Sequence, residues 1–165
     1  MTFPEKIWIG PQFNSTGLFV LGQSAYGDYD ENLATDDGYI RAYLTSQIRD
    51  AAYDRWARAA KQTVEKFWNG VMFTNYVLWT GQKREPGPTS KNYRDAESRL
   101  TAILEEYRPK FVWIIGREQS RYSKVTIDAA GIPNEVTSIR ASDKAFGVAW
   151  ENISKSIKFN VASDA

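Results

Sequence analysis

The sequence of 165 residues predicts an α/β protein in which a central four-stranded parallel sheet lies between two layers of helices. Short apolar runs that break into glycine or polar residues predict buried parallel strands. Between them lie longer segments whose apolar residues recur at helical spacing. Strands and helices alternate four times, which favours a parallel sheet with right-handed crossovers. We therefore expect a three-layer α/β/α fold, with the whole chain, 1–165, forming a single domain.

The composition excludes several kinds of chemistry. The chain has no cysteine and no histidine, so disulfides, thiolate catalysis, serine-histidine triads and most zinc sites are ruled out. Its 21 basic and 20 acidic residues give a net charge of +1, so any contact with nucleic acid must be local. No apolar run approaches the roughly 18 residues of a membrane helix. We expect a soluble, cytoplasmic protein without a membrane contact, a metal or another cofactor.

The amino-terminal part contains the first strand. Residues 1–16 are irregular, and their short apolar patch, 7–9, predicts an edge strand or an arm that covers the core. Residues 18–22 predict the first parallel strand. The segment 27–38 is acidic and is expected to be a solvated loop with helix-start signals at 35–37. Its acidic residues are Asp28, Asp30, Glu31, Asp36 and Asp37. A magnesium site there would need a phosphate to share the ion.

The middle of the chain predicts helices followed by a second strand. Apolar residues from Ile40 to Phe67 follow one helical face over a length that suits one long helix or two. The Asn69-Gly70 pair is a turn signal, and residues 71–76 predict the second strand. Residues 79–90 form a loop by composition. Ser90 is expected to cap the helix that follows it.

The carboxyl-terminal part predicts two more strand and helix pairs. Pro109 ends a helix, and residues 111–116 predict the third strand. A helix through Tyr122, Val125 and Ala129 leads to a short fourth strand at about 135–139. Ser142 is expected to cap the last helix. The tryptophans on apolar faces are core residues by default, and these are Trp56, Trp68, Trp113 and Trp150.

Polar groups follow the first two strands. Gly22-Gln23-Ser24 follows the first strand, and Asn75 ends the second. Ligands of open α/β sheets bind outside the carboxyl ends of the strands, so these two groups can hold a small planar ligand between them. The segment lacks the glycine spacing of a dinucleotide fold and the lysine of a phosphate loop. The plain alternatives are a strand-to-helix turn without a ligand and an asparagine that only holds a turn.

These motifs resemble the uracil-DNA glycosylase superfamily. The run Val20-Leu21-Gly22-Gln23-x-x-Tyr26 is similar to the first motif of members that read Gly-Gln-Asp-Pro-Tyr-His. The strand that carries Asn75, with Ser90-Lys91-Asn92 further on, resembles the base-reading strand and its loop. Arg140-Ala141-Ser142 stands where the family carries His-Pro-Ser. In spacing, the resemblance covers residues 17–157, and it implies a uracil-DNA glycosylase-like fold.

The resemblance implies roles for individual residues. The backbone amide of Gln23 would hold a uracil carbonyl, and Tyr26 would block a 5-methyl group. Asn75 would offer its amide to both the donor and the acceptor of the pyrimidine edge. Ser90 and Ser142 would contact phosphates. The implied partner is single- or double-stranded DNA that contains uracil or an altered base, and the damaged nucleotide would be flipped out of the duplex for repair.

Two departures from the family pattern bear on catalysis. Ser24 stands where the family has its water-activating aspartate, and Arg140 stands where it has histidine. Asp28 is the best placed replacement for the carboxylate, and Arg140 can favour a leaving uracil anion because it is permanently cationic. We therefore expect a DNA N-glycosylase, a hydrolase that cleaves the N-glycosidic bond of the flipped base.

Two other functions stay open on the sequence alone. The first is a catalytically impaired or inactive module of the same fold that binds a nucleobase, a nucleic acid or a protein partner. Ser24 and the missing histidine favour it. The second is a flavodoxin-like domain with another small ligand.

Overall fold

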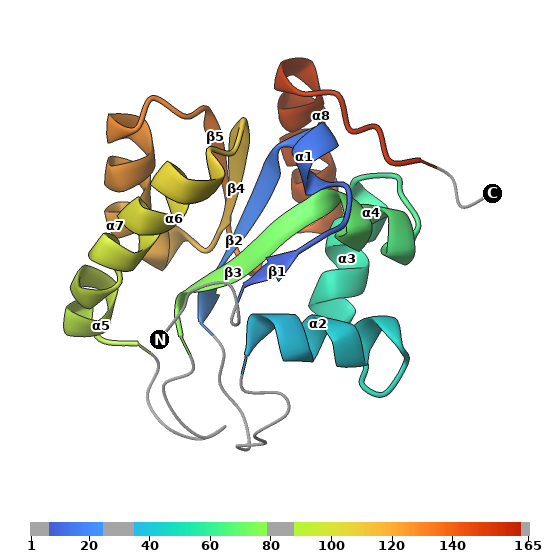
Figure 1. The fold of residues 1–165 in the computed structure, drawn as a ribbon, viewed down its shortest axis with the longest axis horizontal. Coiled ribbons are helices and arrows are strands. Elements are labelled where there is room, and N and C mark those ends of the chain that lie inside the picture. Colours follow the sequence, from blue (N-terminus) through green and yellow to red (C-terminus); the bar gives the residue numbers. More distant parts are fainter. Residues whose placement is uncertain (1–6, 25–34, 79–87, 163–165) are drawn as a thin grey trace.

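The structure is a computed structural model, and it describes residues 7–24, 35–78 and 88–162 (Figure 1). The strands are β1 (Trp8–Ile9), β2 (Leu18–Ser24), β3 (Val71–Val77), β4 (Phe111–Ile115) and β5 (Asn134–Thr137). The helices of the first half are α1 (Phe13–Thr16), α2 (Asp36–Leu44), α3 (Ala51–Ala59) and α4 (Val64–Gly70). Those of the second half are α5 (Ser90–Asp95), α6 (Glu97–Tyr107), α7 (Arg117–Ala129) and α8 (Asp143–Ser156).

The sheet has five strands in the order β1-β3-β2-β4-β5. The pairs β2–β3, β2–β4 and β4–β5 are parallel, so the four longer strands run in one direction. Strand β1 pairs antiparallel with β3, with Trp8 opposite Phe73. The apolar patch at 7–9 is thus an edge strand, and the expectation of a purely parallel sheet of four strands is corrected to a mixed sheet of five.

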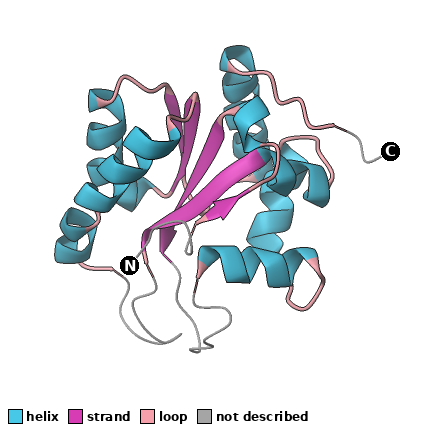
Figure 2. Ribbon diagram, in the orientation of Figure 1, coloured by secondary structure: helices cyan, strands magenta, loops and turns pink. Residues whose placement is uncertain are grey.

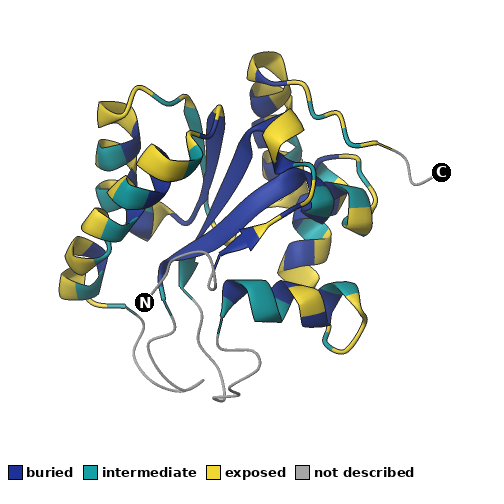
Figure 3. Ribbon diagram, in the orientation of Figure 1, coloured by how far each residue is buried: buried dark blue, intermediate teal, exposed yellow. Residues whose placement is uncertain are grey.

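Helices cover both faces of this sheet (Figure 2). Alternate residues of β2 serve two separate cores because successive side chains of a strand point to opposite faces. Leu18 and Val20 pack with the side chains of α2, α3, α4 and α8. Phe19 and Leu21 pack with those of α5, α6 and α7. The described strands at the centre of the sheet are buried on both sides (Figure 3), as expected for parallel strands.

The segment 36–70 forms three helices rather than one or two. Thr35, Asp50 and Thr63 each cap a helix by accepting a hydrogen bond from a backbone N–H three residues later. Ser46 and Lys61 have positive φ angles of 62° and 54°, which interrupts the helical backbone before the next cap. Local capping therefore divides a continuous apolar pattern into short helices.

The second half of the chain corrects two details. Thr89, not Ser90, caps α5, and it forms a capping box with Asn92. Helix α7 does not bury the predicted face, because Val125 is 66% exposed and Ala129 is also exposed. Its buried residues are Gln119, Ser123 and Ile127.

Two other expectations, the cap of α8 and the buried tryptophans, are confirmed. Ser142 caps α8 by accepting a hydrogen bond of 3.2 Å from the N–H of Ala145. Trp56, Trp68, Trp113 and Trp150 are all buried in the core. Within the described ranges, the helices lack the combination of length and apolar character that would let one cross a membrane.

Candidate functional site

The carboxyl ends of the parallel strands form the candidate site. Numbered by their place in the chain, the four parallel strands are ordered 2-1-3-4, with β2 at the centre. After β2, the chain forms β3 on one side of β2 and later forms β4 on the other side. The carboxyl end of β2 is therefore a topological switch point of the sheet. In Figure 1 the ends of β2 and β3 lie close to the start of α2. The sequence predicts a bound ligand at this edge of the sheet.

Gly22 and Asn75 are neighbours at this edge. They are opposite one another in the register of β2 and β3. A Cβ atom on Gly22 would lie only 2.5 Å from Asn75 Oδ1 and 3.1 Å from the ring of Phe73. Glycine at position 22 therefore makes room for the Asn75 amide, and the structure brings together the two groups on which the site hypothesis depends.

A buried carboxylate holds Asn75. Asp36, the first residue of α2, is 7% exposed. Its Oδ1 accepts a hydrogen bond of 2.7 Å from Asn75 Nδ2. Its Oδ2 accepts bonds of 3.0 Å from the backbone N–H of Asn75 and 2.6 Å from the hydroxyl of Thr74. The prediction that Asp36 belongs to a solvated acidic loop is wrong, because Asp36 is buried at the start of α2. The three hydrogen-bond donors compensate the cost of its burial.

Arg99 of α6 completes this cluster. Its Nη1 donates to the carbonyl of Asn75 at 3.0 Å, and its Nη2 donates to the hydroxyl of Thr74 at 2.7 Å. Strand β1 pairs with Phe73 and Met72 but does not extend to Asn75. Asp36 accepts a hydrogen bond from the backbone N–H of Asn75, and Arg99 donates one to its C=O. The two side chains thus take the place of a neighbouring strand, because the backbone groups of an unpaired strand edge are otherwise left to solvent.

The cluster shifts the pKa values of both charged groups. Burial raises the pKa of the Asp36 carboxyl above its ordinary value of 3.8, and the hydrogen bonds from Thr74 and Asn75 and the charge of Arg99 oppose this rise. Burial also lowers the pKa of Arg99, and the charge of Asp36 opposes that change. Each group therefore offsets part of the desolvation cost of the other.

Two other residues of the first motif are described, Gln23 and Ser24. They end β2 and are partly exposed. The side chain of Gln23 packs against Gly116, where a Cβ atom would lie 2.8 Å from Gln23 Oε1. Gly116 has a φ of 127°, which other residues rarely adopt. Tyr26 and Asp28 lie outside the described residues.

Gln119 joins the ends of β2 and β4. Its side chain is fully buried, and its Nε2 donates bonds of 3.0 Å to the carbonyls of Leu21 and Ile115. Its Oε1 is buried and has no hydrogen-bond partner in the described part of the chain. The crevice between the two strands is therefore closed at its base by one amide.

Arg140 and Ser142 lie at the other end of the same edge. They follow β5, which is three strand positions from β3, so the sheet separates their region from Asn75 by roughly 14 Å. Both residues line a hollow of about 630 Å³, together with Arg117, Ser138, Lys144 and Glu135. Three cations and three hydroxyl residues, of which Thr137 is the third, thus line one surface hollow whose lining carries a single carboxylate.

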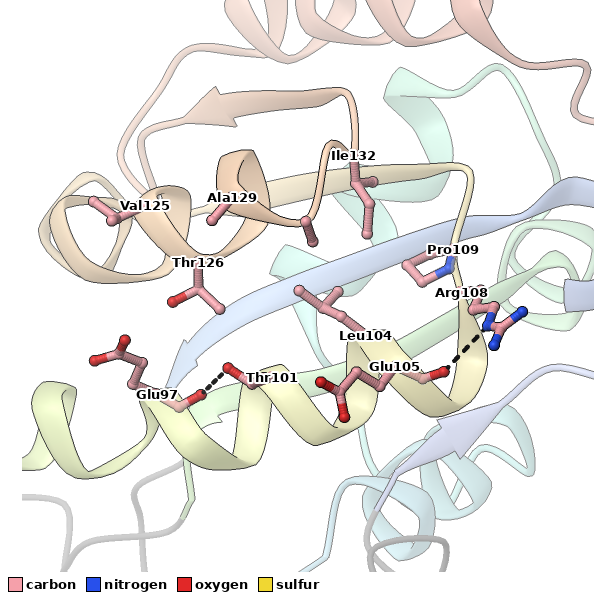
Figure 4. A pocket seen from close by; sticks show the side chains of 11 residues that line it. Glu97, Thr101, Leu104, Glu105, Arg108, Pro109, Val125, Thr126, Ala129 and Ile132 are labelled. Carbon is pink, nitrogen blue, oxygen red and sulfur yellow. Dashed lines mark hydrogen bonds between the residues drawn. The ribbon is translucent and has the colours of Figure 1, made fainter.

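Ser90 is not part of this group. It is exposed in the first turn of α5, whose core residue Tyr93 packs on the opposite face of the sheet from α8. A second hollow, of about 610 Å³, lies between α6 and α7 and is lined by Leu104, Val125 and Ile132 (Figure 4). None of the predicted site residues lines it. Within the described residues, no group of three or more acidic side chains is placed to hold a metal ion.

The sequence analysis missed Asp36, Thr74, Arg99 and Gln119 as members of the site. Two signals pointed to some of them. Thr74 directly precedes Asn75, and Arg99 is four residues before the buried Ile103, on the inward side of its helix. A charge on a buried helical face needs a partner of opposite charge, and Asp36 supplies it.

No protein-family model matches this chain, and a comparison with curated proteins finds no significant match. The case for a function therefore depends on the arrangement of the residues at the carboxyl edge of the sheet.

Proposed function

We propose that the protein is a uracil-DNA glycosylase-like hydrolase, which binds a flipped uracil or another altered base in DNA and cleaves its N-glycosidic bond. The observation that carries this proposal is the placement of the Asn75 amide beside Gly22 at the switch point of the sheet. An amide fixed at this position offers a hydrogen-bond acceptor and a donor side by side, as recognition of a pyrimidine edge requires.

The cationic hollow near β5 supports a nucleic acid as the ligand. Arg117, Arg140 and Lys144 form a local positive patch on a chain whose net charge is only +1. Phosphates bind to such patches, and Ser142 can add a hydroxyl donor. The separation of roughly 14 Å between β3 and β5 suits a nucleotide whose base is read by Asn75 while a neighbouring phosphate contacts Arg140. This arrangement favours Arg140 as a phosphate ligand over a direct contact with the departing base.

Hydrolysis needs a group that activates water. Asp36 does not suit this role, because both of its oxygens already accept hydrogen bonds from Thr74 and Asn75. We assign the role to Asp28, the carboxylate that follows the first motif most closely. A general base contributes roughly 10²- to 10⁴-fold to a rate.

The test is release of free uracil from a labelled single-stranded oligonucleotide. Asn75→Ala should abolish release, because it removes the base-reading amide. Asn69→Ala is the matched control, since Asn69 precedes β3 at the opposite end of the strand and should leave release unchanged. Thermal unfolding of both variants shows whether they are folded. Undiminished release by folded Asn75→Ala would refute the assignment of the pocket.

A second candidate is a module of the same kind that binds a base without cleaving it. Ser24 favours this function, because a serine hydroxyl at the position of the family's aspartate does not act as a base at neutral pH. Binding and release measured in the same sample separate the two candidates: saturable binding without any free base supports the module. Flavin is a suitable control ligand, because flavodoxin-like sheets share the strand order 2-1-3-4.

A further inference from the structure

We infer that the hollow between α6 and α7 is an interface at which two copies of this chain form an antiparallel dimer. A surface whose apolar parts and charges complement those of an inverted copy of itself can bind that copy about a two-fold axis. The inference is independent of the proposed function, because none of the predicted site residues lines this hollow.

The hollow is lined mainly by apolar side chains. Its volume is about 610 Å³, and the buried Leu104 of α6 forms part of its lining. On the side of α7 lies Val125, which at 66% exposure is the most exposed large apolar side chain in the described part of the chain. Ala129 and Ala130 beside it are also exposed. Exposed apolar side chains grouped around a hollow indicate a surface that binds a partner.

The two ends of the hollow carry opposite charges. Glu97 begins α6 and Arg108 directly follows its last residue, and Figure 4 shows the two side chains at opposite ends of the hollow. Because α6 has 11 residues, these charges are separated by roughly 16 Å along the helix. Both side chains are exposed, and neither takes part in an ion pair within the described ranges. Glu105, the third charged residue of the lining, lies one turn before Arg108.

These charges select one orientation of the second copy. When the two hollows face each other about an axis that runs across the helices, the two α6 helices are antiparallel. Glu97 of each copy then faces Arg108 of the other copy. A parallel pair would place Glu97 against Glu97 and Arg108 against Arg108, so like charges would repel at both ends. The charge pattern of the hollow is therefore complementary to that of an inverted copy of the same chain.

The same orientation brings the apolar parts together. Val125 lies toward the Glu97 end of the hollow, whereas Pro109 and Ile132 lie toward the Arg108 end (Figure 4). Inversion of one copy therefore places the exposed Val125 over Pro109 and Ile132 of the other copy, and this happens twice. An interface that is limited to two helices is small, so we expect a weak dimer that forms at high protein concentration.

The first test is sedimentation equilibrium of the full chain over a wide range of protein concentrations. The wild-type protein should show a reversible equilibrium of monomer and dimer. Val125→Asp should raise the dissociation constant roughly tenfold or more, because it places a charge in the apolar contact. Val148→Asp is the matched control, since Val148 of α8 is also an exposed valine on a helix, and it should leave the constant unchanged. A wild-type protein that stays monomeric, or a Val125→Asp variant that dimerises as well as the wild type, overturns the inference.

The second test reverses the charges at the two ends. Glu97→Arg and Arg108→Glu should each be monomeric, because each variant faces like charges at both ends of the interface. An equimolar mixture of the two variants should form a heterodimer, since every end then joins opposite charges. Thermal unfolding shows that each variant is folded. If the wild-type protein dimerises but the mixture of folded variants does not, the antiparallel arrangement is wrong.

Discussion

Gly22 and Asn75 face each other across β2 and β3, and the amide oxygen of Asn75 occupies the space that any side chain at position 22 would need. Gly22→Ala should therefore displace the amide and weaken the binding of a uracil oligonucleotide. We expect a loss of about 1–3 kcal/mol in the free energy of unfolding, which is the usual cost of overpacking. Chemical denaturation and equilibrium binding measure the two effects.

Gly147→Ala is the control for this prediction, since a Cβ atom at Gly147 of α8 meets no atom within 4 Å. Full binding by Gly22→Ala would contradict the proposed contact between the strand and the amide.

The stability of the protein should depend on the ionisation of Asp36. Burial raises the pKa of this carboxyl, so its contribution to stability is fully present below the ordinary value of 3.8 and is lost as the pH rises through the raised value. The charged groups that bear on Asp36 include Arg99 of α6. Burial raises the pKa of Tyr53 of α3, and the charge of Asp36 adds to that rise. Removing the charge should therefore flatten the pH profile.

The measurement is the melting temperature of wild-type protein and Asp36→Asn between pH 3 and pH 7. The deficit of the variant relative to the wild-type protein should shrink as the pH rises, because the wild-type carboxyl loses its contribution as the pH passes its raised pKa. A deficit that grows with pH would show that the folded state stabilises the ionised form instead.

The cationic hollow should act on all nucleic acids alike. Arg140→Ala and Lys144→Ala should weaken binding to oligonucleotides with uracil, with cytosine and with an abasic site by similar factors, because phosphate contacts do not read the base. Each substitution should also reduce the salt dependence of binding by about one counterion.

Lys155→Ala is the matched control, since Lys155 is exposed in the last turn of α8, at the end opposite to Ser142. Titrations at several salt concentrations measure the effect. A loss of affinity that is confined to the uracil oligonucleotide would instead indicate that Arg140 contacts the base.

Asp28 should be required for turnover but not for binding. Asp28→Asn should slow uracil release by roughly 10²- to 10⁴-fold, the range that a general base contributes, and leave the affinity for the substrate unchanged. Asp30→Asn is the control two residues away. Single-turnover release and equilibrium binding separate the two properties, and equal rates in both variants would remove Asp28 from the mechanism.

The sequence predicted the main strands well, and the reason is physical. Strands β2, β3 and β4 are buried on both faces, so they appear as continuous apolar runs that need no tertiary information. The short edge strand β1 was left open between a strand and an arm, because its residues Trp8 and Ile9 are too few to show a period. The buried face of α7 was missed because Gln119 and Ser123 are polar.

The site was only partly predictable for a different reason. Gly22 and Asn75 each lie two residues before the carboxyl end of their strand, and the rule that ligands bind at the carboxyl edge places them together. The contact of Asp36 with Asn75 joins residues 39 positions apart in the chain, and an acidic segment gives no sign of which carboxylate becomes buried. The helical position of Arg99 indicates a buried charge, but its contact with the carbonyl of Asn75 is identified only when α6 is packed against β3.

The two hydrogen bonds from the Gln119 side chain to the carbonyls of Leu21 and Ile115 have a consequence for the size of the ligand. One amide ties the first turn of α7 to two strand ends, so the space between the ends of β2 and β4 cannot widen without breaking at least one of these hydrogen bonds. A bulkier ligand would have to bind on the β3 side of β2. There, Asp36 and Arg99, which both contact Asn75, limit the size of the site.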